Sequence, residues 1–192
     1  MHRISLHRSF TFPSFSSKVN LGKRFSSNES ILRSWLFGET DWSDDLRPNS
    51  FEDFVSSCER LKIDPTSEEN LLTIELNRPS KMNSFDMLMW QELEQAFQYI
   101  ESSVKHSPRA IILRGAGPVF STGMDLQVFQ VLNKLASEIS CEARKREKLG
   151  KFIGRLQRII SAPEQCQVPV IAEIQGYCLG GAVDLITVRK LK

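Results

Sequence analysis

Residues that commonly bind metal ions are scarce in this sequence, and those present are scattered. The 192 residues include only three histidines and four cysteines: His2, His7, His106, Cys58, Cys141, Cys166 and Cys178. No pair of cysteines has the C-x-x-C spacing typical of zinc sites, so we predict no metal site. Widely spaced cysteines are typical of reduced thiols in a reducing compartment.

Long apolar runs and a strong net charge are also missing. No stretch of 18 consecutive apolar residues occurs, which argues against a membrane-spanning helix. The formal net charge is only +2, which argues against an extended nucleic-acid-binding surface. A hydrophobic content of 41% and a charged content of 25% are ordinary for a globular chain. The length allows one domain with appendages.

Acidic residues are absent from the first 28 positions, where serines and basic residues are frequent. The basic residues are Arg3, Arg8, Lys18, Lys23 and Arg24. This composition predicts a mitochondrial transit peptide over residues 1–28, with Arg24-Phe25-Ser26-Ser27 as the processing site. A disordered basic tail is the alternative. The mitochondrial matrix is therefore the predicted location, with the peroxisome or cytosol as alternatives.

Residues 29–69 form a predicted N-terminal extension that is too apolar to be a simple linker. Its aromatic residues include Trp35 and Trp42, and Asp44, Asp45 and Pro48 interrupt it. A short amphipathic helix is predicted over Phe51–Leu61. We expect the extension to pack against the main domain.

From residue 70 onward, predicted strands and helices alternate, which indicates an α/β fold. Strands are predicted at Leu71–Leu76 and Ala110–Arg114. Between them lies a predicted helix that Asn83 or Ser84 caps, with Asp86 in its first turn. Apolar residues at helical spacing should form its buried side: Phe85, Leu88, Met89, Leu93, Ala96, Phe97, Ile100 and Val104.

The following segment is predicted to contain a loop and two further helices. Residues 115–123 form the loop, and Met124-Asp125-Leu126 enters the next helix. The charged residues 142–148 indicate a solvated helical face, although a basic patch that contacts a phosphate remains the alternative. A later helix carries a buried stripe and ends before Pro163; the stripe consists of Phe152, Ile153, Leu156, Ile159 and Ile160.

Pro169–Leu185 is the stretch that most clearly indicates a functional site. It contains a predicted buried strand at Val170–Ile174, a glycine-rich turn, and a helix that starts near Val183. A helix start presents unpaired N–H groups and a partial positive charge, which can stabilise an oxygen that gains negative charge. Asp184 lies one turn into this helix and can act there as an acid or base.

Three stretches together resemble the enoyl-CoA hydratase/isomerase (crotonase-like) superfamily, in the order in which that superfamily carries them. They are Asn77–Asn83, Gly115–Leu126 and Pro169–Leu185. The resemblance covers residues 70–187 and implies a crotonase-like core of repeated β-β-α units. It also implies a partial domain over residues 70–192, incomplete at its C-terminus, because relatives continue well beyond Asp184.

Within the superfamily, the sequence looks most like the branch that moves the double bonds of 3,5-dienoyl-CoA to the 2,4 position. That branch carries an aspartate where Asp184 stands, whereas hydratases usually carry a glutamate. The resemblance therefore implies an acyl-CoA double-bond isomerase of fatty-acid β-oxidation. Enoyl-CoA hydration, Δ3-Δ2 isomerisation and a non-catalytic truncated subunit are the alternatives.

The resemblance also assigns roles to particular residues. The backbone N–H groups of Met124 and Gly181 would form the oxyanion hole, and Asp184 would transfer the proton. Asp184 would need an apolar pocket that raises its pKa, and Val183 and Leu185 are its neighbours in sequence. Substrate would contact Gly123, Met124, Asp125, Leu126, Gly180, Gly181, Ala182 and Lys81.

Other expectations concern the edges of this site. Asp125 is expected to cap a helix. Arg78 and Lys81 are expected to direct charge toward CoA, with a solvated position as the alternative for both. No cofactor is implied, because CoA is part of the substrate. Members of the superfamily form homo-oligomers, as trimers or hexamers.

Overall fold

A four-stranded sheet forms the centre of the fold in a computed structural model of the chain. The structure describes residues 27–38, 48, 50–66, 70–102 and 108–187. The strands lie in the order β1-β2-β3-β4 and comprise β1 (Leu61–Thr66), β2 (Leu71–Leu76), β3 (Ala110–Gly115) and β4 (Val170–Glu173). β1 and β2 are antiparallel, whereas β2–β3 and β3–β4 are parallel pairs.

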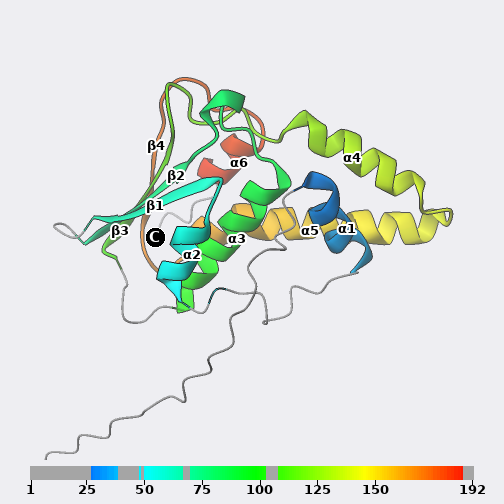
Figure 1. The fold of residues 1–192 in the computed structure, drawn as a ribbon, viewed down its shortest axis with the longest axis horizontal. Coiled ribbons are helices and arrows are strands. Elements are labelled where there is room, and N and C mark those ends of the chain that lie inside the picture. Colours follow the sequence, from blue (N-terminus) through cyan, green and yellow to red (C-terminus); the bar gives the residue numbers. More distant parts are fainter. Residues whose placement is uncertain (1–26, 39–47, 49, 67–69, 103–107, 188–192) are drawn as a thin grey trace, which may run out of the picture.

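The helices lie to one side of this sheet in Figure 1. They are α1 (Asn28–Phe37), α2 (Phe51–Ser57), the short 3-10 helix η2 (Pro79–Lys81), α3 (Met87–Ser102), α4 (Leu126–Ser137), α5 (Glu142–Gln165) and α6 (Gly181–Thr187). Among the described residues, no helix is both long enough and apolar enough to cross a membrane. The mixed α/β architecture is the predicted one.

The core lies between α3 and the helix-facing side of the sheet. Alternate residues of β2 and β3 are buried because successive side chains of a strand point to opposite faces. The predicted apolar stripe of α3 is buried against them, from Phe85 through Ile100. Val104, the last predicted member of that stripe, lies outside the described residues.

The N-terminal extension packs on the main domain, as expected. Ile31, Leu32 and Leu36 of α1 are buried, and α1 contacts α3, α4 and α5. Ion pairs join α1 to α4, including Glu29 to Lys134 at 3.2 Å. β1 shows that the sheet begins before residue 70, so the expected division between residues 69 and 70 falls within a β-hairpin. Residues 1–26 of the predicted transit peptide lie outside the described residues.

Several local predictions were wrong. Ile153 of the predicted buried stripe is 52% exposed, and the helix predicted over Phe51–Leu61 ends at Ser57. The N-cap of α3 is Asp86, whose Oδ1 accepts the Met89 N–H at 2.9 Å, rather than Asn83 or Ser84. α5 continues two residues past Pro163, because only the last turn of the helix is affected by the missing N–H of proline. β4 is not fully buried, since Ile171 is exposed on the strand that ends the sheet.

Candidate functional site

Two glycine turns, one after β3 and one after β4, lie in direct contact. Gly123 and Gly180 both have positive φ, of 80° and 54°. A Cβ atom added to Gly123 would lie 2.6 Å from the Leu179 carbonyl oxygen and 3.0 Å from the Gly181 nitrogen. Only glycine permits both this backbone conformation and this close approach. The two loops that carry the turns run side by side beyond the strands in Figure 1.

The backbone N–H groups of Met124 and Gly181 donate no hydrogen bond within the described part of the chain. Their neighbours are bonded: the Phe85 N–H donates to the Gly123 carbonyl at 2.7 Å, and the Asp125 N–H donates to the Phe85 carbonyl at 3.0 Å. The two adjoining turns therefore carry two unused donors. Such donors can stabilise an oxygen atom on which negative charge develops.

Asp184 lies in the first turn of α6, with an exposed carboxylate. Ala182 and Leu185 of the same helix point into the core, whereas Val183 is 38% exposed. The apolar pocket expected around Asp184 is therefore not formed by the described residues. Its apolar neighbours in sequence lie on a different face or are themselves open to solvent.

Beyond the ends of β3 and β4, further hydrogen bonds hold the two loops together. The Ser121 N–H donates to the Tyr177 carbonyl, and the Leu179 N–H donates to the Ser121 carbonyl, both at 3.1 Å. The side-chain amide of Gln175 donates to the carbonyls of Gly115 and Gly117 at 2.9 and 2.7 Å. Gln175 thus clamps the second loop to the first; the sequence had indicated only that the strand ends there.

Asn83 fixes the start of this arrangement, a role that sequence analysis missed. The residue is fully buried, with a positive φ of 51°. Its side-chain oxygen accepts the Arg78 N–H at 2.9 Å, and its amide donates to the carbonyls of Ala116 and Val119 at 2.9 and 2.8 Å. Asparagine tolerates the left-handed conformation, which is the signal that could have identified a loop anchor here.

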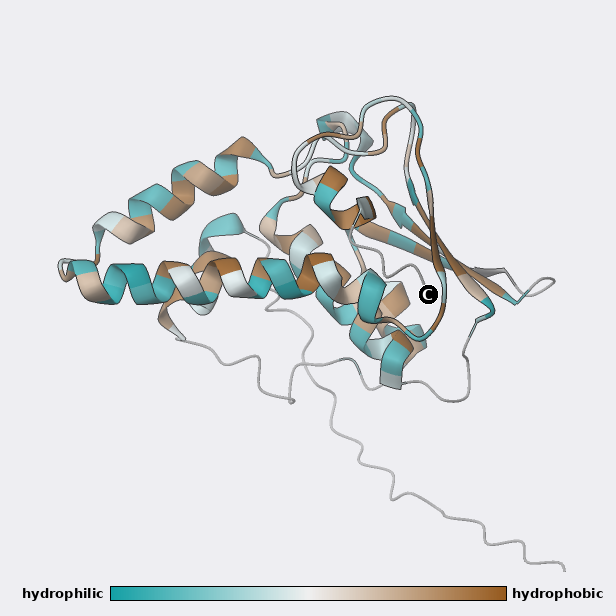
Figure 2. Cartoon of the chain, turned by 180° about the vertical axis from the view of Figure 1, so that it is seen from behind, coloured by the Kyte–Doolittle hydropathy of each residue, from teal (hydrophilic) through white to brown (hydrophobic). Residues whose placement is uncertain are grey.

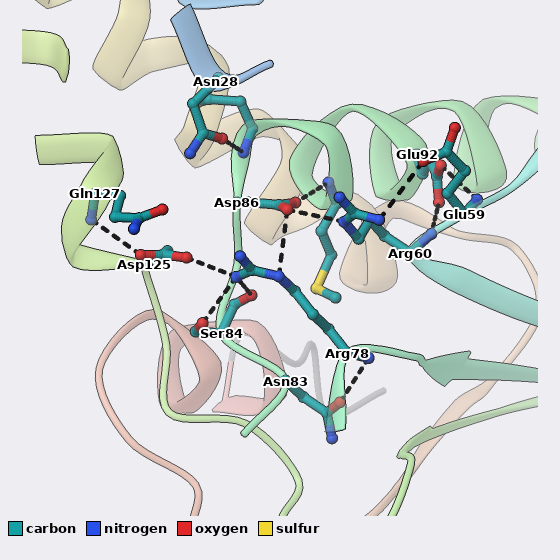
Figure 3. Close-up of polar contacts among 12 residues, drawn as sticks. Asn28, Glu59, Arg60, Arg78, Asn83, Ser84, Asp86, Glu92, Asp125 and Gln127 are labelled. Carbon is teal, nitrogen blue, oxygen red and sulfur yellow. Dashed lines mark hydrogen bonds and ion pairs between the residues drawn. The ribbon is translucent and has the colours of Figure 1, made fainter. Parts of the chain in front are cut away.

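Arg78 joins the first turns of two helices, as Figure 3 shows. Its guanidinium lies 2.6 Å from the Asp125 carboxylate and 3.3 Å from the Asp86 carboxylate. It also donates to the Ser84 carbonyl and hydroxyl, both at 3.0 Å. The Nε and Nη1 groups of Arg78 are therefore engaged within the chain.

Asp125 is the N-cap of α4, as expected, and accepts the Gln127 N–H at 2.9 Å. Burial of Asp125 would by itself raise its pKa. The Gln127 N–H and the Arg78 guanidinium outweigh that effect and hold the pKa of Asp125 below its ordinary value. Asp125 is therefore an ionised structural carboxylate beside the Met124 turn.

The other predicted site residues are spread over the surroundings of the turns. Leu126 is 75% exposed at the start of α4, and Lys81 is exposed at the end of η2. Residues 142–148 belong to the first half of α5, which is mostly hydrophilic in Figure 2. Within the ranges that the structure describes, no three His, Cys, Asp or Glu side chains are grouped as metal ligands.

Comparison with known proteins places this geometry in a family. The family model for enoyl-CoA hydratase/isomerase matches residues 66–188. The chain is 36% identical over 124 residues to the mitochondrial Delta(3,5)-Delta(2,4)-dienoyl-CoA isomerase of Rattus norvegicus, covering 64% of this chain and 36% of that protein. It is 36% identical over 121 residues to a peroxisomal enzyme of the same name from Arabidopsis thaliana, covering 63% of this chain and 43% of that protein.

A solved structure agrees with these sequence relatives. The crystal structure of an enoyl-CoA hydratase/isomerase from Marinobacter aquaeolei superposes with a TM-score of 0.57 at 28% identity, covering 70% of this chain and 48% of that one. The chain thus spans less than half the length of the relatives named here. With its family match, its mixed α/β fold and its paired glycine turns, the chain belongs to the enoyl-CoA hydratase/isomerase family.

Proposed function

We propose that this chain carries the thioester-binding turns and one proton-transferring carboxylate of a dienoyl-CoA isomerase, which converts 3,5-dienoyl-CoA to 2,4-dienoyl-CoA. The observation that carries the proposal is the pair of unused N–H groups, on Met124 and Gly181, in turns that touch each other. Asp184 follows one of them in the first turn of α6. The names of the mitochondrial and peroxisomal relatives support the choice of reaction.

The proposed chemistry begins with removal of a proton from a carbon of the acyl chain. The electrons of that C–H bond form a new double bond, and negative charge accumulates on the thioester oxygen. The Met124 and Gly181 N–H groups stabilise that oxygen through two hydrogen bonds. Asp184 exchanges one of the two protons with the acyl chain. A second acid–base group, a carboxylate or a water molecule, exchanges the other proton at a different carbon, which completes the isomerisation.

The acyl-CoA assay that tests this proposal uses the complete 192-residue chain and the Asp184→Asn variant. With a 3,5-dienoyl-CoA substrate, we expect the wild-type chain to accumulate the conjugated 2,4 product, which absorbs ultraviolet light at a longer wavelength. Asp184→Asn removes the proton acceptor but keeps the size of the side chain, so turnover should fall at least about 100-fold. Equal turnover by both proteins would refute the assigned role of Asp184.

Enoyl-CoA hydration and Δ3-Δ2 isomerisation are distinguished from this reaction by their products. The same two N–H groups serve all three reactions, since each places negative charge on the thioester oxygen. Assays with a 2-enoyl-CoA and a 3-enoyl-CoA substrate therefore accompany the first. Formation of a 3-hydroxyacyl-CoA would favour the hydratase reaction, although the aspartate at position 184 favours the isomerase.

A second candidate function is a non-catalytic subunit that a longer member of the family completes. The described residues leave several large apolar side chains exposed around β4 and the following turn: Ile171, Ile174, Tyr177 and Leu179. An exposed cluster of this kind is typical of an interaction surface. Co-expression with a longer dienoyl-CoA isomerase, followed by size-exclusion chromatography, tests it; separate elution of the two chains would contradict it.

We also propose a mitochondrial location, with the peroxisome as the alternative. The names of the rat and plant relatives support these two compartments, and the basic, serine-rich residues 1–28 favour the first. Fluorescence microscopy of the chain fused at its C-terminus to a fluorescent protein tests the proposal. Removal of residues 1–26 should abolish mitochondrial import.

A further inference from the structure

Ser121 is a fully buried residue at the point where three segments of the chain meet. Its backbone N–H and carbonyl pair with Tyr177 and Leu179 of the second glycine loop, both at 3.1 Å. Its hydroxyl donates to the Asn83 carbonyl at 2.7 Å and accepts the Gly123 N–H at 3.1 Å. One residue thus binds the Asn83 anchor, the Gly123 turn and the Leu179 turn.

The Met124 N–H shares a peptide group with the Gly123 carbonyl, which accepts the Phe85 N–H at 2.7 Å. The Ser121 hydroxyl holds the preceding peptide group through the Gly123 N–H at 3.1 Å, so the two bonds together fix the backbone of Gly123 and with it the direction of the Met124 N–H. On the opposite side, the position of a Gly123 Cβ would be 3.0 Å from the Gly181 nitrogen, so the two turns have little room to move independently. The Ser121 backbone holds one turn, and its side chain holds the other.

We propose that Ser121 is a positioning residue that sets the separation and direction of the Met124 and Gly181 N–H groups. It touches neither substrate nor proton in this role. The part of the inference that concerns polarisation of a thioester rests on the proposed function. The coupling of the two turns does not, because it follows from the contacts of Ser121.

The replacement Ser121→Ala removes a single oxygen atom from a buried site. The Gly123 N–H and the Asn83 carbonyl then lose their partner, while the backbone bonds of residue 121 to the second loop remain possible. A reaction that depends on two aligned donors is sensitive to displacements of about 1 Å. We therefore expect kcat to fall about 10- to 100-fold while KM changes less than about threefold, because the rest of the substrate-binding surface is untouched.

Thr122→Val is the matched control. It removes a hydroxyl from the next residue, where the oxygen makes only a 3.4 Å contact with the Met82 carbonyl. Its kcat and KM should stay within about twofold of wild type, because no N–H group of either turn depends on that hydroxyl.

A measurement on the free protein tests the coupling without any substrate. In NMR spectra of the complete chain, Ser121→Ala should speed hydrogen exchange of the Gly123 amide at least about tenfold and shift the amide resonances of Met124, Leu179 and Gly181. Thr122→Val should leave the resonances of Leu179 and Gly181 unchanged. Wild-type resonances for Leu179 and Gly181 in Ser121→Ala would overturn the inference.

Absorbance of a bound conjugated acyl-CoA then separates this inference from the proposed function. Hydrogen bonds to the thioester oxygen move that absorbance to longer wavelength, and Ser121→Ala should reduce the shift by at least half at saturation. Binding by the wild-type chain with no shift would refute the oxyanion-hole assignment, while the NMR result would still decide the coupling. An equal shift in wild type and Ser121→Ala would overturn the positioning role instead.

Discussion

The ion pairs of Arg78 make the replacement Arg78→Met the most informative test of the fold around the site. The Arg78 side chain is only 15% exposed, and its partners Asp86 and Asp125 are 6% and 11% exposed. Removal of one partner from a buried ion pair costs about 3–5 kcal/mol, because the remaining charge stays buried. Asp86 keeps Arg60 at 2.8 Å, and Asp125 keeps the Gln127 N–H. The expected loss in the free energy of unfolding is therefore at the lower end, about 3 kcal/mol.

Urea denaturation followed by circular dichroism measures that loss, and Lys151→Met is its matched control. Lys151 pairs with Glu147 at 2.7 Å, with side chains that are 72% and 62% exposed. An exposed pair contributes only about 0–1 kcal/mol, so the control should be nearly as stable as wild type. Losses of similar size in the two variants would refute the conclusion that Arg78 is a structural residue at the helix starts.

The pH dependence of the difference between wild type and Arg78→Met gives a further check. The pKa of Asp125 is held below its ordinary value, so its contribution to stability is present above the unfolded-state pKa of about 3.9 and is lost as the pH falls through the folded-state pKa. Arg78→Met removes part of that contribution. The stability difference should be largest above about pH 5 and shrink below about pH 4.

Four other substitutions test separate parts of the structure by urea denaturation. Gly123→Ala should lower the free energy of unfolding by at least about 2 kcal/mol, because the new Cβ would be 2.6 Å from the Leu179 carbonyl oxygen and the residue has a φ of 80°. Gly150→Ala is the control. Its new Cβ has no other atom within 4 Å, so this replacement should be neutral or stabilise α5 by up to about 1 kcal/mol. Leu32→Ala should cost about 2–5 kcal/mol because the side chain is 0% exposed, and a cost below about 1 kcal/mol would contradict the docking of α1. Glu92→Gln should lower the free energy of unfolding by about 1–3 kcal/mol, because the carboxylate accepts three backbone N–H groups at 2.9 Å where β1 begins. An unchanged urea midpoint of unfolding would contradict that anchoring role.

The elements predicted from sequence are those whose apolar pattern has a clear period. Leu71–Leu76 and Ala110–Arg114 alternate cleanly, and the stripe of α3 recurs at helical spacing, so their type and buried faces follow from local physics. β1 was missed even though Leu61 and Ile63 are buried while Lys62 and Asp64 are exposed. A proline at position 65 hid that pattern, since proline is tolerated only in a strand at the edge of a sheet.

The contacts between the two loops could not be read from sequence. The glycine turns were recognisable, but the buried residues that hold the segments around them, Asn83 and Ser121, are common loop residues with no distinctive spacing. Their importance arises from the parallel pairing of β2 with β3 and of β3 with β4, which brings segments far apart in sequence side by side. The ion pairs of Arg78 were hidden for the same reason.

The sharing of Arg78 between Asp86 and Asp125 has a consequence for local opening of the molecule. Because one guanidinium serves the caps of α3 and α4, fraying of either helix start weakens the other. These two helix starts should therefore open together as one cooperative unit, with similar protection of their first amides from solvent exchange. The loop that carries Met124 would then gain or lose order along with the beginning of the helix that covers the sheet.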